Sequence, residues 1–355
     1  MLTEARTAAG AGPSLARESL HALPKTELHV HLDGSLRPGT MIELAEEAGV
    51  ELPSREPDEL ERRMRAEDSR NLEDYLERFD ITLSLMQRGD ALERVAFELA
   101  EDNARENVRY MEVRYSPILL IEEGLPLTET VEAPLRGLRR AQELYGIRTS
   151  LIICGIRNMD PATSRDLADL TVAYKGRGVV AFDLAGAEYN YPAKKHRNAF
   201  FTVINKNMAA TIHAGEAYGP ESIHQALHYC RANRIGHGTR LYEDPDLMRF
   251  VRDFRIPLEI CLTSNVQTRA VDSFAAHPLR TYYDAGLVVT LNTDNRLISG
   301  TTVTDEYLAA HRHLGFDWDE LTHIARMGFE SAFLPWDEKR ELVDQVSREM
   351  EALAP

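Results

Sequence analysis

Eight short apolar runs alternate with longer amphipathic stretches along most of this 355-residue chain. The runs are nearly continuous in aliphatic and β-branched residues, which is typical of strands buried on both faces of a sheet. We expect strands at residues 27–31, 108–115, 148–154, 178–184, 209–213, 234–236, 257–261 and 287–292. Because each strand is followed by helical sequence, the pattern predicts an α/β fold, a single (β/α)8 TIM barrel.

Extra helical sequence is expected at two places, between strands one and two and at the C-terminus. Residues 71–87 carry an apolar stripe, which favours an ordinary packed helix, with a lid over the barrel mouth as the alternative. The sequence of residues 337–353 predicts a helix that closes the domain at its C-terminus. An open doubly wound sheet would want a glycine-rich phosphate loop after strand one, where this chain has His29-Val30-His31.

Charge and composition bear on the possible partners and on the location. The chain has 41 Lys and Arg against 57 Asp and Glu, a net charge of −16 that repels nucleic-acid phosphates and also aids solubility. Cys154, Cys230 and Cys261 are far apart, which favours a reducing compartment without a disulfide framework. No apolar run reaches the ~20 residues of a membrane span. We expect a cytoplasmic protein that binds neither nucleic acid nor membrane.

Histidine and aspartate side chains occur at the ends of several predicted strands. His29 and His31 are two positions apart in a strand, so their side chains share one face. His213 ends the fifth strand and Asp294 closes the eighth. Because the carboxyl ends of barrel strands meet at one face, these side chains can converge on one ion. Three imidazoles and one carboxylate suit zinc, and nickel, cobalt or iron could chemically substitute.

Several stretches of the sequence resemble the adenosine deaminase family. They lie in the family's order from about residue 20 to the end, at Pro24–Leu36, Glu112–Pro117, Asp183–Gly186, His213–Glu216, Gly236–Gly238, Cys261–Asn265 and Asn292–Asp294. The resemblance implies hydrolytic removal of the 6-amino group of adenosine or 2′-deoxyadenosine, giving inosine or 2′-deoxyinosine and ammonia. Its partner would be a small purine nucleoside. Related two-metal barrels carry a lysine after strand four, which residues 182–188 lack, so we expect one zinc ion per chain.

The resemblance also implies three catalytic residues. Zinc lowers the pKa of a bound water, and His237 can orient that water, take its proton and stabilise the developing charge. Asp294 can assist through its free oxygen. Glu216 follows His213 by three residues and can donate a proton to purine N1 if a desolvated pocket raises its pKa.

Four residues are expected to contact the substrate: His31, Asp33, Gly186 and Asn295. Gly186 lacks a Cβ, so its N–H could approach purine N3, although a plain turn glycine is the alternative. Asp33 could accept a hydrogen bond from a ribose hydroxyl. Base-specific relatives tend to have glutamate there, so aspartate favours a nucleoside over free adenine. Asn295 can donate to purine N7 without needing a proton.

Other functions stay open at this point. They are deamination of adenine or of a modified aminopurine nucleoside and, more distantly, a non-catalytic purine-binding role. Glu112 and Arg114 are expected to form a buried structural pair under the site. We expect residues 1–19 to be a flexible tail and 20–355 the catalytic barrel, in a monomer or a homodimer.

Overall fold

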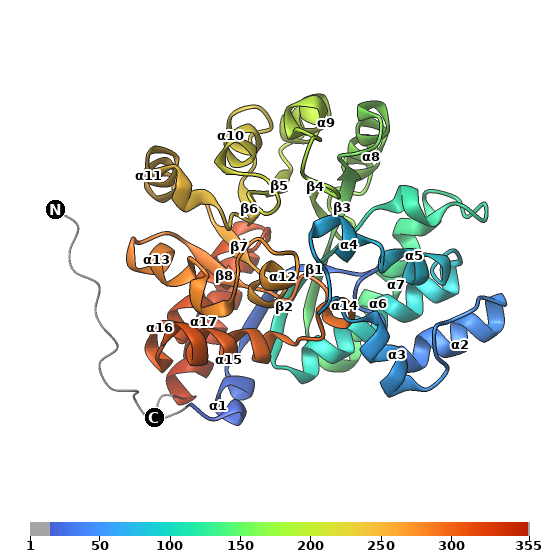
Figure 1. The fold of residues 1–355 in the computed structure, drawn as a ribbon, viewed down its shortest axis with the longest axis horizontal. Helices are drawn as coiled ribbons and strands as arrows, with labels where there is room; N and C mark the ends of the chain where they lie inside the picture. Colours follow the sequence, from blue (N-terminus) through green and yellow to red (C-terminus); the bar gives the residue numbers. More distant parts are fainter. Residues whose placement is uncertain (1–14, 354–355) are drawn as a thin grey trace.

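The computed structural model describes residues 15–353 and has the architecture of a (β/α)8 barrel (Figure 1). Its strands pair in parallel and in chain order from β1 to β8. They are β1 Lys25–His31, β2 Val108–Tyr115, β3 Arg148–Ile156, β4 Val179–Ala185, β5 Ala209–Ala214, β6 Arg234–His237, β7 Leu258–Ile260 and β8 Val289–Leu291. All eight strands predicted from the apolar runs are confirmed, and every residue of β1 is buried, as a strand covered on both faces requires.

The barrel closes where β1 meets the end of β8. The backbone N–H of His31 donates to the carbonyl of Asp294 (2.7 Å), and the N–H of Asp294 donates to the carbonyl of His29 (2.9 Å). Val30 and Asp294 form an isolated parallel bridge at the same place. The seam of the barrel is therefore made by the main chain of the residues expected to bind metal.

Helices surround the strands (Figure 1). Between β1 and β2 lie α2 Pro38–Ala48, α3 Pro57–Met64, α4 Leu72–Leu76, α5 Phe79–Ser84 and α6 Gly89–Arg105. Between later strands lie η1 Pro117–Leu120, α7 Glu129–Tyr145, α8 Pro161–Ala173, η2 Ala193–His196, α9 Arg197–Asn205, α10 Pro220–His228, η3 Leu241–Glu243, α11 Pro245–Asp253, α12 Leu262–Gln267, η4 Phe274–Ala276 and α13 Leu279–Asp284. After β8 come α14 Arg296–Ser299, α15 Val303–Leu314, α16 Trp318–Ser331 and α17 Trp336–Leu353. The extra helices expected after β1 and at the C-terminus are confirmed.

The apolar stripe at residues 71–87 does not form the single helix that was expected. It is divided between α4 and α5, with a turn at Glu77 and Arg78. The reason is that its side chains pack in two places. Tyr75 and Phe79 join a small apolar cluster near the barrel mouth, whereas Leu83 packs against the main core.

The N-terminal helix α1 (Arg17–Ala22) packs against α15, and Arg17 forms an ion pair with Asp305 at 3.1 Å. Residues 17–19 of the expected tail belong to α1, and residues 1–14 lie outside the described residues. Within residues 15–353, no helix has the length and apolar character needed to cross a membrane.

Candidate metal centre and active site

Four expected metal ligands meet at the carboxyl ends of the strands. The Nε2 atoms of His29 and His31 each lie 3.0 Å from Nε2 of His213. Oδ1 of Asp294 lies 3.4 Å from Nε2 of both His29 and His31. All four residues are buried, with at most 9% of each exposed. Three imidazole nitrogens and a carboxylate oxygen thus face one small space, and their chemistry fits a divalent cation such as zinc.

Two carboxylates hold the rings of this cluster from behind. Nδ1 of His29 lies 2.8 Å from Glu259, and Nδ1 of His213 lies 3.0 Å from Asp183. A carboxylate accepts, so each Nδ1 carries the hydrogen and each Nε2 turns its lone pair toward the shared space. Burial, followed by the charge of Arg114, lowers the pKa of His29 to about 4, which keeps this ring in its neutral, ligand form.

Below the cluster lies a fully buried network of ion pairs. Arg114 bridges Asp183 (3.1 Å) and Glu259 (3.0 Å). Arg234 binds Glu259 at 2.6 Å and also pairs with Glu112. Glu112 and Arg114 are both buried, as expected, but no ion pair joins them, because each faces a different partner across the barrel. The network surrounds Glu259 with two guanidinium groups and one imidazole.

His237 and Glu216 lie beside the four expected ligands. A ring nitrogen of His237 lies within 4.8 Å of donor atoms of His29, His213 and Asp294, so distance alone does not set it apart as a non-ligand. Its Nδ1 is 3.0 Å from the Asn265 amide, and its Nε2 is 3.5 Å from Oε2 of Glu216. His237 and Asp294 both adopt left-handed backbone conformations (φ 63° and 62°), a strain that often marks functional sites.

Glu216 is buried, and its Oε1 has no hydrogen-bond partner. Burial raises the pKa of this carboxyl above its ordinary value. The protonated form is therefore favoured more than in water, and a protonated carboxyl can donate to a ring nitrogen.

Three residues expected to contact the substrate, Asp33, Gly186 and Asn295, have different surroundings. Asp33 is buried, its Oδ1 has no hydrogen-bond partner and lies 3.9 Å from Nδ1 of His31, and burial raises its pKa to about 7. Gly186 has φ +91°, and a Cβ there would come within 2.9 Å of Asn158 Oδ1, so the position requires glycine. The amide nitrogen of Asn295 donates to the Tyr75 hydroxyl at 2.8 Å, which leaves one amide hydrogen for a ligand.

A protein-family model described as Adenosine deaminase matches residues 24–349 of this chain. The chain belongs to the adenosine deaminase family. The resemblance found in the sequence motifs is thereby confirmed. An adenosine deaminase from Mycobacterium sp. (strain JLS) is 43% identical over 348 residues, covering 94% of this chain and 96% of that protein.

Solved structures of related enzymes share the fold. Adenine deaminase from Arthrobacter aurescens gives a TM-score of 0.86 at 28% identity and covers 93% of this chain and 99% of its own. An amidohydrolase from Burkholderia ambifaria, crystallised with bound Zn, gives 0.88 at 25% identity, covering 98% of this chain and 96% of its own. The barrel is thus shared with an enzyme named for adenine and with a zinc-bound amidohydrolase.

Glu188 is a buried residue that the sequence analysis did not identify, and it holds the loop after β5 in place. The carboxylate of Glu188 accepts hydrogen bonds from the backbone N–H groups of Gly215 (2.7 Å), Glu216 (3.0 Å), Ala217 (2.6 Å) and Tyr218 (3.0 Å). Gly215, at φ +75°, allows the chain to turn tightly there. Glu188 therefore fixes the backbone that carries Glu216.

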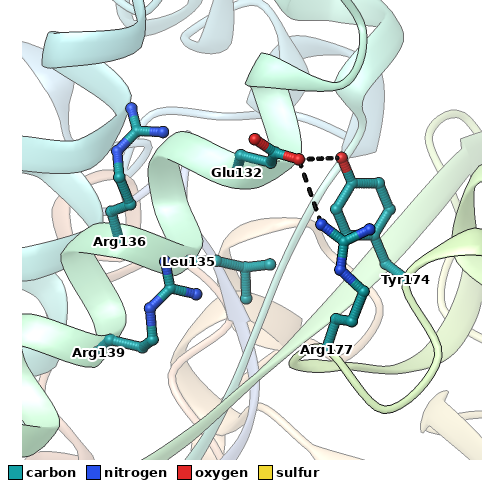
Figure 2. A pocket seen from close by; sticks show the side chains of 6 residues that line it. All are labelled: Glu132, Leu135, Arg136, Arg139, Tyr174 and Arg177. Carbon is teal, nitrogen blue, oxygen red and sulfur yellow. Dashed lines mark hydrogen bonds and ion pairs between the residues drawn. The ribbon is translucent and has the colours of Figure 1, made fainter.

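Two surface hollows differ in their relation to the adenosine deaminase site. One of about 350 Å³ is lined by Glu216, Tyr189 and Arg240 and by residues 70–73 and 268–270, so it opens onto the site. The other, of about 460 Å³, lies on the outside of the barrel along α7, where Glu132 binds Tyr174 and Arg177 (Figure 2). None of the expected site residues lines the second hollow. Residues 71–73, at the start of the segment considered as a lid, form one wall of the first hollow.

Proposed function

We propose that this protein is a zinc-dependent adenosine deaminase, which converts adenosine and 2′-deoxyadenosine to inosine and 2′-deoxyinosine with release of ammonia. One observation carries the proposal. The buried carboxyl of Glu216, whose Oε1 has no hydrogen-bond partner, lies beside a cluster of three imidazoles and a carboxylate. Hydrolytic deamination of a purine requires an activated water on one side of C6 and a proton donor at N1, and these groups supply both.

The residues proposed to hold one zinc ion are His29, His31, His213 and Asp294. Their fit is supported by the inward-facing Nε2 atoms and by the carboxylates behind His29 and His213. A zinc ion bound there would act as a Lewis acid that makes water nucleophilic near neutral pH.

The remaining steps are assigned to side chains of the site. Protonated Glu216 donates to purine N1 as C6 becomes tetrahedral. His237 forms a hydrogen bond with the attacking oxygen, and Asp294, whose Oδ2 accepts from Ser264 at 2.6 Å, is held in place beside it. Asp33 accepts from a ribose hydroxyl through its unpartnered oxygen. His31, Gly186 and Asn295 are proposed to contact the substrate.

Two other functions make different predictions. A deaminase of free adenine or of a modified aminopurine nucleoside would share the catalytic cluster, and one structural relative is named an adenine deaminase. The buried Asp33 favours the nucleoside, because a carboxyl oxygen that has no hydrogen-bond partner suits a ribose hydroxyl, which adenine lacks. A non-catalytic purine-binding protein should have lost a ligand or the acid, and here His29, His213, Asp294 and Glu216 are all present.

We also propose that residues 20–355 act as one catalytic unit in the cytoplasm, as a monomer or a homodimer, with a small purine nucleoside as its partner. The net charge of −16 disfavours a nucleic-acid partner.

A substrate panel tests the proposed function. Adenosine, 2′-deoxyadenosine, adenine and 5′-substituted adenosines are followed by ultraviolet absorbance, with metal content measured in parallel. We expect rapid turnover of both nucleosides and little of adenine, and loss of turnover after chelation that zinc restores. Faster turnover of adenine would show that Asp33 has been misinterpreted. A fully active preparation without a transition metal would overturn the metal assignment.

Replacement of Asp33 with alanine should weaken nucleoside turnover selectively. Hydrogen bonds to charged groups contribute about 1.5–3 kcal/mol, so kcat/KM for adenosine should fall about 10–150-fold. Residual turnover of adenine should hardly change, because the base has no ribose to lose contact with. An equal loss for adenosine and adenine would show that Asp33 supports the fold of the site and does not bind ribose.

A further inference from the structure

His277 is a buried histidine outside the proposed metal set, and its protonated nitrogen is fixed by the main chain. The backbone N–H of Leu279 donates to Nδ1 of His277 at 3.1 Å. A backbone N–H can only donate, so Nδ1 must be the bare nitrogen and the hydrogen of the neutral ring lies on Nε2. The neutral form is favoured because burial lowers the pKa of His277 to about 3.

The orientation of the Asn265 amide follows from His277. Nε2 of His277 lies 3.2 Å from Oδ1 of Asn265 and donates to it, and the Thr239 hydroxyl donates to the same oxygen at 3.0 Å. Asn265 is fully buried, and Thr239 is too. With its oxygen held by two donors, the amide must present its NH2 group to the other neighbour, which is Nδ1 of His237 at 3.0 Å.

The chain of donors ends in the active site. Because the Asn265 amide donates to Nδ1 of His237, that nitrogen carries no hydrogen, and the ring hydrogen lies on Nε2, which faces Glu216 at 3.5 Å. We propose that Asn265 and His277 are positioning residues that hold His237 as a hydrogen-bond donor toward the attacking oxygen. The proposal rests on the deaminase function proposed above. It excludes His237 as the base, so the proton that the attacking water loses passes to the carboxylate of Asp294.

The role of a donor retains two parts of the expectation from the sequence, which are orienting the water and stabilising the developing charge, and excludes the third, which is taking the proton of the water. To act as a base, His237 would need a bare Nε2 and hence a hydrogen on Nδ1, directly opposite the amide hydrogens of Asn265. Two donors facing each other in a buried site would leave both unsatisfied. As a donor, His237 would stabilise negative charge that develops on oxygen in the transition state, a term that is commonly worth about 10²–10³ in kcat.

Nitrogen-15 NMR of histidine rings in the zinc-loaded wild-type protein tests the inference directly, because protonated and bare ring nitrogens have different chemical shifts. The chain offers a reference for each tautomer. Nε2 of His196 donates to the carbonyl of Arg157 (3.1 Å), whereas Nδ1 of His311 donates to the carbonyl of Phe316 (2.8 Å). We expect the His237 signals, assigned by their loss in H237N, to match the His196 pattern. A hydrogen on Nδ1 of His237 would overturn the proposal, whether or not the protein turns over adenosine.

An isosteric exchange at Asn265 provides the kinetic test. In N265D the carboxylate can only accept, so it should draw the hydrogen of His237 to Nδ1 and leave Nε2 bare. We expect kcat to fall about 100-fold or more while KM changes little. The matched control is N233D, an exposed site before β6 whose Oδ1 accepts from the Ala210 N–H at 2.9 Å, and its kcat should equal that of wild type.

The outcomes separate the two proposals. Unchanged or higher kcat in N265D, with the hydrogen on Nδ1 and normal zinc content, would show that His237 works as a base. Absence of adenosine turnover in the wild type, with His237 protonated on Nε2, would overturn the proposed substrate and leave the hydrogen-bond chain intact. If N265D fails to fold, the wild-type NMR measurement still decides the tautomer.

Discussion

Replacement of Glu216 with glutamine is expected to lower kcat for adenosine by about 10²–10⁴-fold, the usual contribution of a positioned general acid or base. Glutamine preserves the shape of the side chain but cannot deliver a proton to purine N1. Burial raises the pKa of Glu216, so its carboxyl holds a proton more readily than it would in water. Steady-state kinetics on zinc-loaded protein provide the measurement.

Zinc content and the unfolding midpoint should be unchanged in E216Q, because Glu216 is not among the proposed ligands. The matched control is E221Q, an exposed position on α10, which should keep wild-type kcat. Substantial residual activity in E216Q would remove Glu216 from the role of acid. Loss of zinc together with activity would instead indicate that the carboxyl supports the metal centre.

Replacement of Glu259 with glutamine should have the largest effect on stability. Glu259 accepts from His29, Arg114 and Arg234, all of them fully or almost fully buried. Removing its charge leaves two buried guanidinium groups undercompensated, and disruption of a buried ion pair typically costs about 3–5 kcal/mol. Zinc affinity should also fall about 10–100-fold, because the partner that orients His29 is altered. Denaturant unfolding and competition with a chelator give the two values.

The control for this prediction is E46Q, because Glu46 pairs with Arg55 at 3.0 Å and both side chains are 60% exposed. An exposed pair contributes about 0–1 kcal/mol, so the stability of E46Q should be close to that of wild type. Equal effects of E259Q and E46Q would show that the buried network contributes little to stability.

The strands and the proposed ligands could be predicted because their signals are local. The two-residue spacing of His29 and His31 places both on one face of a strand, and His213 and Asp294 lie at strand ends that a barrel brings together. Glu259 had a local signal too, as a lone charge within the apolar run 257–261, but a single residue has no spacing pattern that names its partner.

Other features depend on contacts that sequence spacing does not encode. The carboxylate of Glu188 accepts hydrogen bonds from four backbone N–H groups in a loop that begins 27 residues further along the chain. Asn295 binds Tyr75, which is 220 positions away and lies on a short helix where one long helix was expected. The orientation of the Asn265 amide depends on His277 and on the turn after it. Such partners are set by tertiary packing, so the tautomer of His237 could not be inferred before the fold was known.

The hydrogen bonds that join β1 to β8 also position residues expected to bind metal, so closure of the barrel and affinity for the ion depend on the same segment. Peptide groups of His29, His31 and Asp294 make its two hydrogen bonds, so exchanging those side chains need not open the sheet. Breaking these two backbone hydrogen bonds, by contrast, would separate the proposed ligands His29 and His31 from Asp294. Any opening of this seam would therefore lower the affinity of the proposed metal site, even with all four ligand side chains in place.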